Sequence, residues 1–390
     1  MRSKLKNPTY TLLVDIGSGS VGFAIVQSHP NQEQPEIIWE VRQSVKLKDV
    51  SSISESRKAI VTTLMDMALT VTQEGIAALR NATGDSKATI TSTLATIAAP
   101  WSYCVTQPVK YEKIDGFSVT EKLVSDLAQT AGTETLVEFE DSYPDLVQDI
   151  TATSRTVLEV RSSGYKLPSV NNQRASTVTL TQATTMAHRN ICDALKEMQH
   201  KLFAKTPINI TGSVLSLYSA IRVNLPHEQD ITLIDVTNEA TEVGIVRDGA
   251  LRYCSHISFG SASIAREIAH ISGKPLVEIH NQLGASIASA PKKDRETLIQ
   301  AYEDKLFELL SETGDPLSTP RSIYLLSDDY TADFLRPIIE RVGKRATKSP
   351  VKVLSISELQ QYFSKSADRA LQINTAFFHT QENQLYFEYL

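Results

Sequence analysis

Two stretches of the chain share one pattern of hydrophobic and polar positions. Residues 10–26 contain an apolar run, a Gly/Ser turn and a second apolar run, an order typical of a β-hairpin. Residues 231–260 repeat this order and add a third strand after an Asp-Gly turn. An aspartate stands at the end of the first apolar run in each stretch, Asp15 in one and Asp235 in the other. The repetition predicts two sheet-based halves in a duplicated α/β architecture.

The segments around the hairpins have the periodicity of further strands and helices. Residues 35–42 alternate and predict a third strand beside the first hairpin. Residues 54–79 carry apolar positions three and four apart, which predicts a helix with one face packed on that sheet. Residues 262–313 predict three helices in the second half. Beyond them we expect strands at 322–326 and 351–354 and helices at 331–342 and 358–369.

A change of pattern in the middle of the chain marks an inserted unit. The preceding strand pattern breaks at Pro100, residues 118–121 have the form of a capping box, and residues 156–161 predict a strand. We therefore expect a small inserted α+β subdomain. The predicted organisation is 1–93 and 173–228 as the two parts of the first half, 94–172 as the insert, and 229–390 as the second half, with a short helical insert at about 270–318.

Composition and charge narrow the range of functions. Of the 390 residues, 41% are hydrophobic and 22% are charged, as in a soluble protein with more than one core. The formal net charge of -6 gives no basic face for a phosphate backbone, so we expect no nucleic-acid partner. Cys104, Cys192 and Cys254 are far apart, which favours reduced thiols in a cytosol over a disulfide framework or a zinc site.

Signals for secretion and membrane crossing are absent from the sequence. Residues 1–8 lack the long apolar stretch and the small-residue cleavage site of a secretion signal. Nowhere do about 18 uninterrupted apolar residues occur, so no transmembrane helix is predicted. The expected location is the cytoplasm.

The turn of the first hairpin has the residue types of a phosphate-binding loop. Glycines let backbone amides approach a phosphate closely, serines add hydroxyl donors, and an aspartate at the strand end can hold a hydrated magnesium ion. A Gly/Ser hairpin is also a common tight turn, so the pattern alone leaves both interpretations open. The candidate cofactor-binding residues in this turn are Asp15, Gly17, Ser18, Gly19, Ser20 and Gly22.

The second hairpin places Asp235 where the first has Asp15. In a duplicated fold the two turns face one another across a cleft, so this pair predicts a magnesium ion held through ATP. Residues 235–242 contain no glycine, however, and Glu239 would bring a carboxylate to the place of phosphate oxygens. Like charges repel strongly in a low-dielectric cleft, so the second turn predicts weak phosphate binding.

A third turn, at residues 326–331, stands where such folds support the base and ribose. A glycine pair would let a flat ring lie against the backbone, whereas Asp328, Asp329 and Tyr330 bring bulk and charge. An aspartate here is also an ordinary helix N-cap, which is the favoured interpretation.

These three turns, in this order, resemble those of the actin, sugar-kinase and heat-shock-chaperone superfamily. Residues 95–127 and 157–169 are similar to the subdomain that FtsA and PilM insert in their first half, and residues 248–269 to the segment after their second phosphate turn. The similarity runs from about residue 10 to residue 345. It implies a duplicated actin-like ATPase (ribonuclease H-like) fold with an inserted α+β subdomain.

The resemblance also implies a function. The leading expectation is an FtsA-like cytoplasmic scaffold in bacterial cell division that recruits partner proteins through its insert and has a degenerate nucleotide site. A PilM-like adaptor in type IV pilus assembly and an active ATPase or kinase are the alternatives. Catalysis is not expected, no catalytic residue is assigned, and ATP with Mg²⁺ is expected to bind weakly.

The resemblance further suggests how the protein is placed in the cell. Members of this superfamily form filaments, so self-association is expected. An interfacial helix needs Lys or Arg beside its apolar face, and residues 380–390 are short and acidic. We therefore expect partners to bring the protein to the inner face of the membrane.

Overall fold

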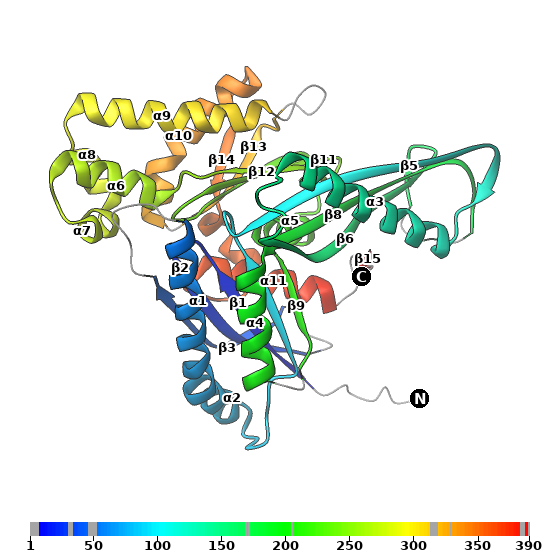
Figure 1. The fold of residues 1–390 in the computed structure, drawn as a ribbon, viewed down its shortest axis with the longest axis horizontal. Helices are drawn as coiled ribbons and strands as arrows, with labels where there is room; N and C mark the ends of the chain where they lie inside the picture. Colours follow the sequence, from blue (N-terminus) through cyan, green and yellow to red (C-terminus); the bar gives the residue numbers. More distant parts are fainter. Residues whose placement is uncertain are drawn as a thin grey trace.

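Three β-sheets and the helices that pack on them make up the protein (Figure 1). The computed structural model describes residues 8–29, 34–45, 53–167, 170, 172–203, 206–312, 319–327, 329–382 and 387–388. Two of the sheets have five strands each in one common order, and the third sheet belongs to an inserted unit.

The first sheet has the strand order β3-β2-β1-β4-β9. Its centre is the antiparallel pair β1 (Thr9–Ile16) and β2 (Ser20–Ser28), and β1 also pairs in parallel with β4 (Ser92–Ile97). The central strands are buried on both faces, which explains why β1 is a continuous apolar run. The remaining strands are β3 (Glu36–Ser44) and β9 (Ile208–Gly212).

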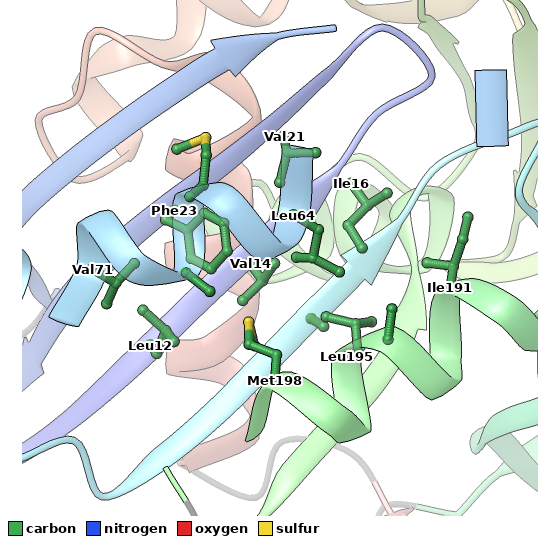
Figure 2. Packing of buried hydrophobic residues seen from close by; sticks show 14 of the residues in the cluster. Leu12, Val14, Ile16, Val21, Phe23, Leu64, Val71, Ile191, Leu195 and Met198 are labelled. Atoms are coloured by element: carbon green, nitrogen blue, oxygen red, sulfur yellow. The ribbon is translucent and has the colours of Figure 1, made fainter. Parts of the chain in front are cut away.

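Alternate side chains of β1 enter two different core layers. Val14 and Ile16 pack with α1 (Ile53–Thr70) in the cluster that Figure 2 shows. Leu13 points to the opposite face and packs with α11 (Arg369–Glu382). The further helices around this sheet are a π-helical turn (Val71–Gly75), α2 (Ile76–Thr83) and α4 (Arg189–Leu202).

The second sheet repeats the first, with the order β12-β11-β10-β13-β14. The antiparallel pair β10 and β11 and the parallel pair β10 and β13 match the pairings of β1. The predicted duplicated architecture is therefore confirmed. Its strands are β10 (Ile231–Val236), β11 (Thr241–Arg247), β12 (Ala250–Ile257), β13 (Ser322–Leu326) and β14 (Lys352–Ser355).

Helices cover both faces of the second sheet. Side chains of α6, α9 and α10 form one core with it, and α5 (Ser213–Asn224) packs on the other face. The helices on the face of the second sheet opposite α5 are α6 (Ser261–Ser272), α7 (Leu276–Asn281), α8 (Leu283–Ser289), α9 (Lys292–Ser311) and α10 (Asp329–Thr347).

The inserted unit is a third sheet whose long β5 arm projects from the two halves (Figure 1). Its strand order is β15-β6-β8-β5, and β7 pairs with β6. The strand β4 belongs to the first sheet, while β8 pairs with both β5 and β6, so the strands that the insert gives to the third sheet lie within residues 102–188. The elements of the insert are β5 (Ser102–Ser118), α3 (Glu121–Ser142), β6 (Ile150–Ser162), β7 (Tyr165–Lys166) and β8 (Arg174–His188). The C-terminal strand β15 (Phe387–Glu388) pairs with β6 at the edge of this sheet.

The C-terminal part of the chain crosses back from the second half to the first. The helix expected at 358–369 is wrong: a 3₁₀ helix (Ile356–Tyr362) comes first, and α11 begins only at Arg369. Asp368 sets this start, because its Oδ1 atom accepts a hydrogen bond from Leu371 N at 3.1 Å, as an N-cap does. In the part of the chain that the structure describes, no helix is both long and apolar enough to cross a membrane.

Candidate functional site

The two predicted aspartates meet at one cavity between the halves. Asp15 and Asp235 both line it, and its volume is about 630 Å³. Of the predicted residues, Gly17, Ser18, Gly19 and Ser20 also line the cavity, whereas Gly22 does not. Further lining residues come from β3, α5 and the start of α11, among them Glu40, Arg42, Ser213, Asp368 and Arg369.

The carboxylate of Asp15 makes all its contacts within the protein. Its Oδ2 atom accepts a hydrogen bond from Arg42 at 2.7 Å. Its Oδ1 atom accepts from Thr96 Oγ1 and from Asn374 Nδ2, each at 3.0 Å. Both oxygens are therefore already bonded, and the side chain is only 6% exposed. A hydrated magnesium ion would have to displace these donors.

Arg42 is the central residue that the sequence analysis missed. It lies on β3 directly opposite Gly22 of β2, and a Cβ atom at Gly22 would be 2.6 Å from its Nη2 atom. The guanidinium donates to Asp15, to Ser20 Oγ at 2.8 Å and to both oxygens of Asp368. Burial alone would lower the pKa of Arg42, but the two carboxylates raise it above its ordinary value. The arginine is thus a permanent cation in the cleft.

The turns of the two hairpins are bonded directly to each other. Ser18 Oγ donates to Thr237 Oγ1 at 2.8 Å and accepts from the backbone N–H of Glu239 at 2.8 Å. Gly19 faces the side chain of Asn238 so closely that any Cβ atom there would overlap it. In the expected arrangement, phosphates would lie between these turns. Here the two turns are bonded directly to each other, beside the cavity that they line.

Glu239 does not point into the cavity, and the expectation that its carboxylate takes the place of phosphate oxygens is wrong. Both of its oxygens accept hydrogen bonds from Arg266 of α6, one of them at 3.0 Å from Nη1. Both side chains are 14% exposed. The negative charge is therefore met by a bidentate ion pair outside the cavity.

Asp235 has weaker support than Asp15. Its Oδ2 atom accepts a hydrogen bond from Ser213 Oγ at 2.9 Å. Burial raises the pKa of Asp235 to about 7, and the negative charge of Asp15 acts in the same direction. On the neighbouring strand Glu242 is also buried, which raises its pKa well above the usual range, and its Oε2 atom has no hydrogen-bond partner among the described residues.

The third predicted turn can be followed only in part. Leu326 and Ser327 line the cavity, and α10 begins at Asp329. Asp328 and the side chains of Asp329 and Tyr330 lie outside the described residues.

These residues do not fit a magnesium ion with ATP. Asp15 is bonded on both oxygens, and the hairpin turns bond to one another. Within the described ranges, no group of three or more His, Cys, Asp or Glu side chains could hold a metal ion. The cavity is present, but Arg42 already pairs with Asp15 and the two hairpin turns are already bonded to each other.

The duplicated sheets, the inserted unit and the cleft between the halves define an actin-like ATPase fold. Solved structures bear this out. A PilM–PilN type IV pilus biogenesis complex contains a chain with 11% identity and a TM-score of 0.58, covering 96% of this chain and 98% of that one.

Other similar structures are more distant. The ethanolamine utilization protein EutJ from Carboxydothermus hydrogenoformans has 11% identity and a TM-score of 0.45, covering 96% of this chain and 92% of that one. A Bacteroides thetaiotaomicron protein with an actin-like ATPase fold and unknown function has 11% identity and a TM-score of 0.40, covering 94% and 95%. No protein-family model and no curated protein match the sequence. At these identities the comparisons establish the fold alone.

Proposed function

We propose that this protein is an actin-fold adaptor that recruits other proteins and does not turn over ATP. The observation that carries this proposal is the direct bonding of the two hairpin turns through Ser18, Thr237 and Glu239. An ATPase must admit phosphates and a metal ion between such turns, whereas a scaffold needs only the architecture. Bacterial cell division, as in FtsA, is the leading setting, and type IV pilus assembly, as in PilM, is the alternative.

The inserted unit is the proposed recruitment surface. Seven large hydrophobic side chains are exposed among the described residues, and five of them lie within residues 102–188. This range is 87 of the 390 residues, so the exposed apolar groups are concentrated there. Exposed apolar groups that gather on one unit are typical of protein-binding surfaces. The five are Tyr111, Ile114, Val137, Tyr143 and Tyr165.

The inserted unit is also held firmly by the second half. Thr106 Oγ1 of β5 donates to the backbone oxygen of Arg252 at 2.5 Å, and Glu159 of β6 forms an ion pair with the Arg252 guanidinium. Removing residues 94–172 would break these contacts and leave β8 without β5 and β6. Surface substitutions are therefore the better test of recruitment.

The recruitment test compares exposed apolar positions inside and outside the inserted unit. Proximity labelling in the source cells would be carried out with the wild type and with Ile114→Asp and Val137→Asp, whose side chains are 101% and 54% exposed. Val277→Asp, on α7 and 56% exposed, is the matched control. We expect the first two variants to lose partners that the control keeps. Recovery of one partner set with all proteins would contradict the proposed surface.

The nucleotide test is a calorimetric titration of the wild type with Mg-ATP. We expect no saturation below about 1 mM, which corresponds to less than about 4 kcal/mol of binding free energy. Micromolar affinity together with turnover would support the active ATPase or kinase instead.

A further inference from the structure

The Arg42 guanidinium is surrounded by carboxylate and hydroxyl oxygens. It is enclosed by Asp15 Oδ2 at 2.7 Å, Ser20 Oγ at 2.8 Å, and both carboxylate oxygens of Asp368, one of them at 3.1 Å. Carboxylate and hydroxyl oxygens are the ligands that Mg²⁺ and Mn²⁺ prefer. These contacts use four donor interactions of a group that has five N–H bonds.

We propose that Arg42 is a built-in cation that replaces a divalent metal ion in this cleft and holds the two halves together without a nucleotide. In the arrangement expected from the sequence, ATP would bring a divalent cation to Asp15. Here a side chain of β3 brings it, and it cannot dissociate. This inference concerns the cleft alone and does not depend on which partner the inserted unit recruits.

The backbone leaves room for this replacement. Gly22 lies opposite Arg42 in the β2–β3 ladder, and a Cβ atom at Gly22 would lie 2.6 Å from Nη2 and 2.9 Å from Cζ. Either distance is too short for a real contact, so any larger residue at position 22 would push the guanidinium away from Asp15. Gly22, expected from the sequence in a phosphate loop, thus leaves space for the Arg42 guanidinium.

Arg42 also fastens the returning C-terminal segment to the first half. Asp368, which pairs with Arg42, is the N-cap of α11. Further along α11, Asn374 Nδ2 donates to Asp15 Oδ1 at 3.0 Å and to Thr96 Oγ1 at 2.6 Å. Glu40 accepts hydrogen bonds from Ser366 Oγ and from the backbone N–H of the next residue. Because this segment arrives from the second half, the cation joins the two halves.

The replacement predicts a latent metal site. In Arg42→Ala, the oxygens of Asp15, Asp368 and Ser20 would face one another without a cation. We expect its melting temperature to fall by about 4 °C, because carboxylates in the cleft lose their partner. We further expect millimolar Mn²⁺ to restore a large part of the fall, and electron paramagnetic resonance to detect about one bound Mn²⁺ per chain. The wild type should show neither effect.

Controls separate this role from a simple structural ion pair. Arg336→Ala removes an arginine that pairs with Glu358 at the surface, so it should respond to Mn²⁺ no more than the wild type does. Adding Asp15→Asn to Arg42→Ala should abolish the Mn²⁺ response. Arg42→Gln, which keeps most of the side-chain volume, replaces Arg42→Ala if that variant does not fold. A folded variant at position 42 that binds no Mn²⁺ would overturn the proposal, and so would a wild type stabilised by Mn²⁺.

Discussion

The two halves of the molecule repeat one strand order but bring different chemistry to the cleft. In the first half, Asp15 meets a guanidinium, a hydroxyl and an amide. In the second half, Asp235 has only the hydroxyl of Ser213, and no arginine or lysine pairs with it among the described contacts. Duplication of a backbone therefore does not carry duplicated electrostatics. The first half supplies the ion pair of Arg42 with Asp15, and the second supplies two carboxyl groups, Asp235 and Glu242, whose pKa values are raised by burial.

Matched amide substitutions test this comparison most strongly. Asp15→Asn should lower the free energy of unfolding by about 3 kcal/mol, because Arg42 loses a carboxylate partner in the cleft. Asp235→Asn should cost about 1 kcal/mol or less, since Asp235 carries a proton over much of the neutral range. The Arg42 side chain is 27% exposed, which keeps the first cost below that of a fully buried pair. Urea denaturation of both variants at pH 7 measures the difference, and equal costs would refute the asymmetry.

The dependence on pH sharpens the same comparison. The pKa of Asp235 is raised to about 7 in the folded protein, above about 3.9 in an unfolded chain. The folded state therefore binds more protons than the unfolded state between these two pH values. The contribution of Asp235 to the free energy of unfolding falls as pH rises toward 7 and levels off above it.

We expect the wild type to gain about 2 kcal/mol relative to Asp235→Asn when the pH falls from 7.5 to about 5.5. Subtracting the variant's stability removes the contribution of other titrating groups. A difference that stays constant over this range, or that grows with rising pH, would contradict the raised pKa.

The sequence contains enough information to predict the duplicated fold and less of the site. The hairpins at residues 10–26 and 231–260 are local, and their apolar runs and turns can be recognised without knowing any distant contact. In the structure β8 pairs with strands up to 85 residues away, such as Ser102 with Ala187, and so extends past the expected bound at 172. Pairing over such distances leaves no local signal.

The same limit explains why Arg42 was missed. It pairs with Asp15, 27 residues away, and with Asp368, 326 residues away. An arginine in an alternating strand is usually an exposed side chain, so the position of Arg42 in the sequence does not indicate that it lies in the cleft. The one usable signal was the glycine at position 22, which the strand register places opposite it. That glycine also fits a phosphate loop, and the two explanations differ only in three dimensions.

The smallest expected change is that in Mg-ATP affinity on substituting Glu239, whose carboxylate is expected from the sequence at the place of phosphate oxygens. Glu239→Gln should cost about 1 kcal/mol, because the amide oxygen still accepts a hydrogen bond from Arg266 in a pair whose side chains are each only 14% exposed. Calorimetric titration should show no change in Mg-ATP affinity, since the carboxylate points away from the cavity. Asn238→Ala is the control for a substitution in the same turn that changes packing without changing charge, because Asn238 lines the cavity and packs against Gly19. A tenfold or greater gain in affinity in Glu239→Gln alone would mean that its charge still reaches the phosphate position. No gain would mean that the contact between the two turns, together with Arg42, prevents Mg-ATP binding. The absence of glycine from the second turn would then act through the packing of the turns more than through the charge of Glu239.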